Sequence, residues 1–487
     1  MYVVGTESSV TGTDQPAAIS VYDPSTEEQI GEIRDGGAAA VDAAVARARE
    51  SFRAGLWTGK PPSERAKILW RFADLIEARA DDLAAIDARN VGMSHGHARN
   101  LMLAAAEQVR YYSGWCTKIY GKSADLSSPG GITGQPARYH AYTIKEPVGV
   151  AGCIVPWNGP ALNAVVKLAP ALTAGASVVL KPAEETPLSA DLLAGLLVEA
   201  GVPEGVVNLV NGHGHTVGAA LAAHDDVDKI AFTGSTEVGK LIVGAAAGNL
   251  KKVMLELGGK SPVLIFDDAD LSQAIPGAAL GIFINSGQGC VCGSRVFAHR
   301  KVYDQVVEGM TKAAQALRLG GPADAAAGKP VDIGPLISAK QLGRVMGFID
   351  EGRADGVEII TGGHRLDRPG YFVEPTVLTG VRPDMRLYRE EIFGPVVAIM
   401  PFDDEEEVVA MANDSIYGLA AAVWTNDLGR SHRLAKRLEA GTVWLNAQFA
   451  WDPAMPFGGY KQSGWGYEYA IEGVEAYMKT KAVYAGL

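Results

Sequence analysis

The chain has 487 residues, 47% of them apolar and 21% charged, which is ordinary composition for a globular protein with more than one core. Its 44 basic and 56 acidic residues give a net charge of −12, so a broad basic surface for nucleic acid is not expected. Residues 148–180 form the most apolar stretch, but prolines and polar residues interrupt it, so no membrane span is predicted. The first seven residues have no basic or Arg-rich character, and no export or transit peptide is expected.

Helix and strand patterns follow one another in a clear order. Residues 36–116 are expected to be mainly helical, with apolar residues at three-to-four spacing in three stretches, 38–52, 63–80 and 99–115. From residue 147 apolar runs alternate with helical stretches such as 161–174 and 188–200. The strands are expected at 148–155, 177–181, 205–210, 229–233 and 252–257. Five buried strands alternating with helices predict an α/β fold with a parallel, doubly wound sheet, whose ligands bind at the C-terminal strand ends.

The remaining segments predict a second domain and an extension. The chain from Ser261 to about Gly458 alternates in the same way and is expected to form a second α/β domain. Residues 129–147 and the last twenty residues are β-prone and have no helix to pair with. Strands of this kind extend out of a globule, and we expect them to pair with another subunit.

A cysteine in a glycine-rich loop is the first candidate for chemistry. Cys290 lies in the octapeptide GQGCVCGS at 287–294, where small residues let the backbone approach a substrate closely. An arbitrary cysteine is more often a small buried hydrophobe, but this setting favours a nucleophile. Only Cys116, Cys153 and Cys292 accompany it, which is too few for a disulfide framework and fits reduced thiols in a cytoplasm. No zinc-ligand spacing is present, so no metal is expected.

Glu256 is the candidate base for this thiol. It is the lone carboxylate of the segment LELGGK at 255–260, at the end of an apolar strand. A carboxylate among leucines and glycines is expected to have a raised pKa, and a nucleophilic thiol needs a proton acceptor. The pair predicts covalent catalysis through a thiohemiacetal or thioester.

Three strand-end turns could bind an anion, a ribose or an oxyanion. The turn FTGSTEVGK at 232–240 joins a strand to a helix and predicts an anion site; it matches a P-loop except that Leu241 replaces the Ser or Thr that binds magnesium, and a purely structural turn also remains open. Glu184 could accept hydrogen bonds from a ribose and repel a 2′-phosphate, which favours NAD over NADP, or it could be a solvated surface residue. Asn158 could donate to an oxyanion, although a simple turn is the better interpretation of its surroundings alone.

Taken together, the motifs resemble those of the aldehyde dehydrogenase superfamily. They appear in the order PWN at 156–158, KPAE at 181–184, FTGS at 232–235, LELGGK at 255–260, GQGC at 287–290 and EEIFGP at 390–395. The resemblance implies a Rossmann-like NAD-binding domain at 1–128 and 148–256, a catalytic domain at 257–460 and an oligomerisation arm at 129–147 and 461–487. It also implies a homodimer or homotetramer, a small aldehyde as the substrate and no nucleic-acid or membrane partner.

The resemblance also implies a role for individual residues. Cys290 would attack the aldehyde, Asn158 and the backbone N–H of Cys290 would hold the oxyanion, and Glu256 would activate the water that hydrolyses the thioester. A CoA-acylating relative generally lacks the base at the position of Glu256, and a non-enzymatic relative would have lost catalytic residues that are intact here. The residues implied at the NAD site are Trp157, Lys181, Glu184, Gly214, Gly234, Ser235, Gly239, Glu391 and Phe393.

The substrate pocket is where the chain departs from the family pattern. Family members usually have an aromatic residue directly after the position of Asn158, but this chain has Gly159 there. Aromatic residues are expected in the pocket only at Phe449, Trp451 and Phe457. No Arg or Lys is present among the implied pocket positions, so a carboxylate-bearing aldehyde would lack a charge partner. We therefore expect a bulky apolar aldehyde, aromatic or long-chain. The implied pocket residues are Gly159, Leu162, Asn163, Val166, Ile284, Gly289, Val291, Phe449, Trp451 and Phe457.

Overall fold

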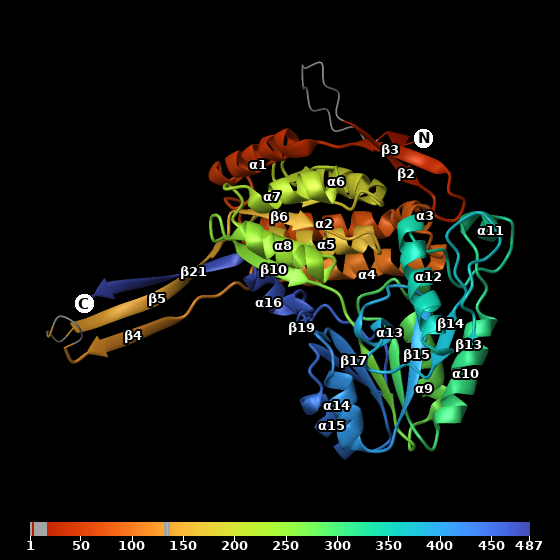
Figure 1. The fold of residues 1–487 in the computed structure, drawn as a ribbon. Helices are drawn as coiled ribbons and strands as arrows, with labels where there is room; N and C mark the ends of the chain where they lie inside the picture. Colours follow the sequence, from red (N-terminus) through yellow and green to blue (C-terminus); the bar gives the residue numbers. More distant parts are fainter. Residues whose placement is uncertain (1, 4–16, 131–133, 135–136) are drawn as a thin grey trace.

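The computed structural model describes residues 2–3, 17–130, 134 and 137–487. Two α/β blocks lie against each other, and a long three-stranded arm projects away from them (Figure 1). The first seven residues, which predicted no export peptide, lie mostly outside the described part of the chain. Within that part, none of the helices is both long and apolar enough to cross a bilayer.

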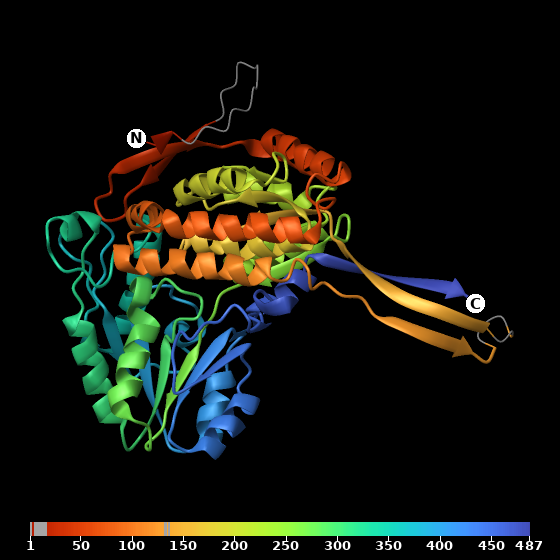
Figure 2. The same cartoon turned by 180° about the vertical axis from the view of Figure 1, so that it is seen from behind.

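Four helices form an N-terminal layer and confirm the predicted helical segment. They are α1 (Gly37–Arg53), α2 (Pro62–Ala78), α3 (Ala80–Val91) and α4 (His95–Ser113). α4 begins at Ser94, whose hydroxyl accepts a hydrogen bond from the backbone N–H of His97. α2 and α4 lie along the outside of the first block, as the view from behind shows (Figure 2). A small sheet of β1 (Tyr2–Val3), β2 (Ala18–Tyr22) and β3 (Gln29–Arg34) precedes them.

The first block is built on a six-stranded sheet in the order β20-β10-β9-β6-β7-β8. The five predicted strands are confirmed and parallel: β6 (Val150–Ile154), β7 (Ser177–Lys181), β8 (Val207–Leu209), β9 (Lys229–Thr233) and β10 (Lys252–Glu256). The helices between them are α5 (Pro160–Ala174), α6 (Leu188–Ala200), α7 (Ala219–Ala223), preceded by the π-helical turn η1 (Gly214–Gly218), and α8 (Thr236–Ala246). All residues of β6 and β7 are buried, as expected when helices cover both faces.

β20 (Gly464–Trp465) was not predicted in this sheet. It pairs antiparallel with β10, with Leu255 opposite Trp465 and Glu256 opposite Gly464. The sequence assigned this segment to the arm, but a two-residue strand has no periodicity that could reveal its partner. The short helix α16 (Ala470–Glu475) also lies in the C-terminal segment that was expected to be only β-prone.

The second block confirms the predicted second α/β domain. Its sheet has the order β13-β14-β15-β12-β11-β17-β18, and only the edge strand β13 runs antiparallel to its neighbour. The strands are β11 (Pro262–Ile265), β12 (Arg295–His299), β13 (Glu358–Thr361), β14 (Thr376–Thr379), β15 (Val396–Phe402), β17 (Ala420–Trp424) and β18 (Thr442–Leu445). The larger helices are α9 (Leu271–Phe283), α10 (Tyr303–Ala316), α12 (Ala339–Ala354), α14 (Glu405–Asn413) and α15 (Leu428–Arg437). Shorter elements are η2 (Ile284–Gly287), α11 (Pro322–Ala326), α13 (Arg386–Arg389), β16 (Tyr417–Gly418) and β19 (Tyr460–Lys461).

The arm is an antiparallel sheet of β4 (Ser123–Ser128), β5 (Ala137–Pro147) and β21 (Met478–Gly486). Its register runs from Met478 opposite Pro147 to Gly486 opposite Tyr139. β4 belongs to this sheet, although the sequence placed 123–128 in the first domain. The reason is that β4 pairs with β5, and such pairing between segments is not visible in the residues of β4 themselves.

Candidate active site

Two glycines at the end of β10 let three loops meet. A Cβ atom on Gly259 would lie 2.2 Å from the backbone oxygen of Cys290, and one on Gly258 would lie 2.5 Å from Oε2 of Glu391. The backbone N–H of Gly259 donates to Oε1 of Glu391 over 2.9 Å. Only residues without a Cβ fit here. The segment LELGGK therefore brings the cysteine loop and the EEIFGP segment to the end of the strand that carries Glu256.

Asn158 is held against the cysteine loop. Its side-chain amide donates to the backbone oxygen of Gln288 over 2.9 Å, and its own backbone oxygen accepts from the side chain of Asn285 over 3.0 Å. Asn285 and Ser286 have positive φ angles of 48° and 57°, which are costly for residues with a Cβ. The strained turn just before Cys290 therefore joins the loop after β6 to the loop that carries the thiol.

Burial and negative charge favour the protonated form of the Cys290 thiol. Cys290 is partly buried, and burial, followed by the nearby carboxyl groups of Glu391 and Glu256, raises the pKa of its thiol above the ordinary value. The backbone N–H of Cys290 approaches its own sulfur and acts in the opposite direction. A thiol in this environment needs a base within reach before it can act as a nucleophile.

Glu256 has the properties expected of that base. Its side chain is buried, and neither carboxyl oxygen has a hydrogen-bond partner. Burial, and then the charge of Glu468, raise the pKa of Glu256 well above the usual carboxyl value, while Lys167 lowers it. The sequence-based expectation of a raised pKa is confirmed in direction.

A buried ion pair beside Glu256 was missed by the sequence analysis. Nζ of Lys167 lies 2.6 Å from Oε1 of Glu468, and both side chains are buried. Lys167 also donates to the hydroxyl of Thr233 over 2.8 Å. The available signal was a lysine within the otherwise apolar helix α5, because lysine is almost never fully buried without a partner. The partner itself could not be found, because it lies 301 residues away.

One group of predicted cofactor residues surrounds Glu184. The ammonium of Lys181 lies 3.0 Å from Oε2 of this carboxylate, and the backbone N–H of Gly214 donates to Oε1 over 3.1 Å. Burial alone would raise the pKa of Glu184, but Lys181 and the backbone amides reverse the effect and lower it. An ionised carboxylate at this position can accept hydrogen bonds from ribose hydroxyls.

The predicted phosphate site is the N-terminus of α8. Ser235 is its N-cap and accepts from the N–H of Val238 over 3.3 Å. Gly239 allows the helix to pack closely on β10, because a Cβ there would lie 2.6 Å from the side chain of Leu257. A Cβ on Gly234 would clash with the ring of Phe232 at 2.3 Å. The turn thus holds the helix end at the strand ends, where N–H groups and the helix dipole favour phosphate.

Trp157 and Phe393 lie together at the other end of the predicted cofactor site. Their ring centroids are 5.2 Å apart in an edge-to-face arrangement. Phe393 has a φ of 60°, which is rare for an aromatic residue. Glu391, two residues earlier, is half-buried, and loss of solvent around its carboxyl raises its pKa to about 7, partly opposed by Gly259 and Lys260. The residues predicted to bind the adenosine end and the nicotinamide end of a dinucleotide therefore form two separate clusters.

The predicted pocket residues come from both blocks but do not all have the same exposure. Gly159, Leu162, Asn163 and Val166 lie in or next to the first two turns of α5, and the side chain of Asn163 donates to the oxygen of Gly159 over 2.9 Å. A Cβ on Gly159 would lie 3.3 Å from the side-chain nitrogen of Asn163 and 3.9 Å from Leu101, so the Asn163 side chain would have to shift by a few tenths of an ångström to admit a larger residue. Three further positions, Ile284, Gly289 and Val291, flank Cys290 in the chain, but Val291 is buried in the core of the second block.

The aromatic wall is larger than the sequence analysis expected. Trp451 packs on Phe457 with ring centroids 4.8 Å apart and stacks on Tyr469 at 6.0 Å. Trp444 lies 5.9 Å from both Phe449 and Trp451. Tyr469 lies near the reacting groups, since after burial Glu468, Cys290 and Glu256 all raise its pKa. Trp444 and Tyr469 were missed because only their positions in the folded chain place them beside the other three.

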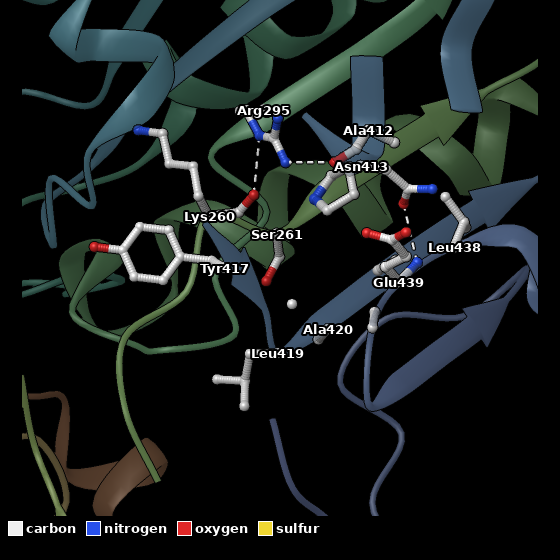
Figure 3. A pocket seen from close by; sticks show the side chains of 14 residues that line it. Lys260, Ser261, Arg295, Ala412, Asn413, Tyr417, Leu419, Ala420, Leu438 and Glu439 are labelled. Atoms are coloured by element: carbon white, nitrogen blue, oxygen red, sulfur yellow. Dashed lines mark hydrogen bonds between the residues drawn. The ribbon is translucent and has the colours of Figure 1, made fainter. Parts of the chain in front are cut away.

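A small cavity of about 10 Å³ lies behind this site, in the second block. Figure 3 shows the side chains around it, including Ser261, Asn413 and Glu439, with Arg295 donating to the backbone oxygen of Lys260 over 2.9 Å. The ammonium of Lys260 points away from this cavity. The volume is that of a single water molecule, and none of the predicted pocket residues lines it. It is therefore not the substrate site.

Comparison with known proteins agrees with this geometry. The aldehyde dehydrogenase family profile matches residues 10–483, so the chain belongs to the aldehyde dehydrogenase family. A putative aldehyde dehydrogenase, DhaS, of Bacillus subtilis is 44% identical over 97% of this chain and 93% of its own length. Phenylacetaldehyde dehydrogenase of Pseudomonas fluorescens is 43% identical over 96% of this chain and 92% of its own length. The NAD⁺ complex of an aldehyde dehydrogenase from Bacillus cereus has a TM-score of 0.93 and 44% identity, covering 97% of this chain and 94% of that one. The protein is an NAD-dependent aldehyde dehydrogenase.

Proposed function

We propose that this enzyme oxidises a bulky apolar aldehyde, aromatic or long-chain, to the carboxylic acid, with Cys290 as the nucleophile. The observation that carries the proposal is that the loop of Cys290 meets the end of the strand that carries Glu256, where a Cβ on Gly259 would lie 2.2 Å from the backbone oxygen of Cys290. The Cys290 thiol lies close enough to Glu256 for the carboxyl to raise the pKa of the thiol, and Glu256 is buried without a hydrogen-bond partner. Such a carboxyl is a base that becomes available on deprotonation.

The reaction proceeds in two stages in this proposal. Glu256 removes the thiol proton, and the sulfur bonds to the aldehyde carbon, while the amide of Asn158 and the backbone N–H of Cys290 hold the resulting oxyanion. The aldehyde hydrogen then departs with its electron pair, for which bound NAD supplies the hydride acceptor, and Glu256 releases its proton to solvent. Water attacks the thioester that remains and gives a proton to Glu256. The acid leaves as the Cys290–carbon bond breaks, and the sulfur takes the proton back from Glu256, which restores the thiol.

The described residues fit NAD at its two ends. Lys181 and Glu184, with Gly214 beside them, would hold the adenosine ribose, and Ser235 with the N-terminus of α8 would hold the pyrophosphate. Glu391 would bind the other ribose through its carboxylate, and Trp157 and Phe393 would pack by the nicotinamide. These groups orient the cofactor and leave the cysteine side of the cleft to the substrate.

The substrate class follows from the walls of the pocket. Five aromatic side chains, from Trp444 to Tyr469, form a continuous wall, and the residue after Asn158 is Gly159, which has no side chain to fill the predicted pocket. No predicted pocket residue is Arg or Lys. The relative that acts on phenylacetaldehyde supports an aromatic substrate. Each well-buried methylene contributes about 0.8 kcal/mol, so a ring or long chain favours binding by roughly 10²-fold or more.

We further propose a cytoplasmic homo-oligomer, a dimer or a tetramer. The arm formed by β4, β5 and β21 carries mainly exposed or half-buried residues and lies away from both blocks, as a surface for another copy of the chain would (Figures 1 and 2). The four cysteines are unpaired, which suits a reducing compartment. The proposed division is an NAD-binding domain on the first block, a catalytic domain on the second and the arm, with β4 counted in the arm and β20 in the first block.

Cys290→Ala tests the nucleophile. It should abolish aldehyde-dependent NADH formation, measured by absorbance, while the NAD dissociation constant stays nearly unchanged. Cys292→Ala is the matched control and should retain most activity, because Cys292 lies two residues further along the chain and its side chain is buried in the core of the second block. An inactive Cys292 variant beside an active Cys290 variant would show that the assignment is wrong.

Gly159→Phe tests the substrate class. The wild-type kcat/KM for phenylacetaldehyde or a long-chain aldehyde should exceed that for acetaldehyde or succinic semialdehyde, and the phenyl ring at 159 should lower the value for the bulky substrate more than for the short one. The new Cβ would lie 3.3 Å from the side-chain nitrogen of Asn163, so circular dichroism of the variant should accompany the kinetics to show that it is folded. Equal efficiency of the wild type on acetaldehyde and on the bulky aldehydes would refute the proposed substrate class.

A further inference from the structure

The loop after β8 places a histidine against the carboxylate proposed to bind the adenosine ribose. Nδ1 of His213 lies 3.5 Å from Oε1 of Glu184, the same oxygen that accepts from the N–H of Gly214. The imidazole is partly exposed, with 38% of its side-chain surface accessible, so it can exchange protons with solvent. Neither the motif order nor the proposed mechanism uses this residue.

The backbone around His213 fixes the position of its ring. Gly212 has a φ of 148°, and a Cβ there would lie 2.4 Å from Asp35 and from Val217. The backbone oxygen of His213 accepts from the N–H groups of Thr216 and Val217, which lie within the turn η1. The ring of His215 stacks on that of His213 with centroids 5.2 Å apart and planes at 19°. The imidazole is therefore presented to Glu184 by a rigid turn.

The charged groups around the imidazole come from three neighbouring elements. Glu184 and Lys181 face it from the end of β7, and Glu185, whose pKa is raised by burial and then by Glu184, follows in the same loop. His215 faces it from η1. Asp35, in the loop before α1, accepts from Thr216 over 2.9 Å and lies on the other side of the turn. Among these, Glu184 is the group with which His213 makes an ion-pair contact.

We propose that His213 is a specificity-determining residue that makes the discrimination between NAD and NADP depend on pH. When the imidazole is neutral, the carboxylate of Glu184 faces a 2′-phosphate with only Lys181 to offset its charge, and NADP is rejected. When the imidazole is protonated, it neutralises Glu184 and adds a cation beside the ribose, so a 2′-phosphate is tolerated. The inference rests on the proposed placement of the adenosine ribose at Glu184.

Equilibrium binding tests this without relying on turnover. The dissociation constants of NAD and NADP are measured by tryptophan fluorescence or calorimetry between pH 5.5 and 8.5, for the wild type and for His213→Gln. The 2′-phosphate itself titrates near pH 6, so some pH dependence of the NADP:NAD ratio remains in any variant. The wild type should gain roughly three- to tenfold more relative NADP affinity on acidification than His213→Gln, as a unit charge near an anion at a partly exposed site would provide.

His224→Gln is the matched control, since it removes a histidine that pairs with Asp42 and not with Glu184, and it should keep the wild-type pH dependence. Identical pH profiles for the wild type and His213→Gln would overturn the proposal, and so would an equal loss of the effect in His224→Gln. Glu184→Gln separates this failure from failure of the cofactor site. If Glu184→Gln leaves the ratio of the NADP and NAD dissociation constants unchanged at pH 8, the ribose is not at Glu184. If Glu184→Gln brings the two dissociation constants closer together while His213→Gln changes nothing, only the role of His213 is wrong.

Discussion

Glu256 and Glu184 both stand at the C-terminal ends of parallel strands in the same sheet, yet they have opposite electrostatic environments. Glu256 ends β10, is buried without a hydrogen-bond partner, and has its pKa raised by burial and by Glu468. Glu184 follows β7, where Lys181 and backbone amides outweigh burial and lower its pKa. Glu256 thus has the environment of a base that gains and loses a proton, whereas Glu184 has the environment of a carboxylate that stays ionised. Packing around a carboxyl, and not its place on the sheet, decides its chemistry.

Removing the carboxylate of Glu256 should have the largest effect. Glu256→Gln is expected to slow steady-state turnover by about 10²–10⁴-fold, because hydrolysis of the thioester loses its base. Stopped-flow absorbance should show a burst of at most one NADH per site; a slow burst would mean that Glu256 also deprotonates the thiol. A variant with the wild-type steady-state rate would exclude this role.

Removing Lys167 should disfavour the ionised form of Glu256 further and should also destabilise the folded protein. Lys167→Met leaves Glu468 buried and unpaired, which costs about 3–5 kcal/mol in the free energy of unfolding. Urea unfolding monitored by circular dichroism measures this loss. Lys312→Met is the control, since it breaks an exposed pair with Glu308 and should cost under about 1 kcal/mol. Equal losses in the two variants would mean that the buried pair contributes no more to stability than the exposed one.

The pH dependence of turnover should show the raised pKa of Glu256. Below that pKa the carboxyl is protonated and cannot act as a base, so kcat for a step limited by hydrolysis should rise with pH, by up to about tenfold per pH unit, until Glu256 is ionised. The sign for stability is opposite: the folded state keeps a proton that the unfolded carboxyl releases near pH 4, so the contribution of Glu256 to stability falls as the pH rises above that value. A kcat that is flat from pH 6 to 9 in both the wild type and Glu256→Gln would contradict this assignment.

Neutralising Glu184 should have the smallest effect. Glu184→Gln keeps the size of the side chain but removes the charge that repels a 2′-phosphate, so the preference for NAD over NADP should narrow by roughly tenfold. The ratio of kcat/KM for the two cofactors measures it. A wild type with equal kcat/KM for NAD and NADP would refute the role given to Glu184 before any variant is made.

Local patterns in the sequence determined most of the fold. The alternation of apolar runs and helical stretches located the five parallel strands, because strands covered on both faces are continuous in apolar residues. The glycines of LELGGK indicated a close approach of backbones, which Gly259 makes with the oxygen of Cys290. A carboxylate in apolar surroundings correctly indicated the raised pKa of Glu256. Each of these properties depends on neighbours in the chain.

Only the tertiary structure decided what lies opposite those residues. The pairing of Lys167 with Glu468, the addition of β20 to the edge of β10, and the joining of Tyr469 to the aromatic wall all connect segments far apart in the chain. The contact of His213 with Glu184 likewise depends on how the turn after β8 folds back on β7. Contacts of this kind leave no period or spacing in the sequence, because they are made by side chains that meet only when the sheets and loops have packed together.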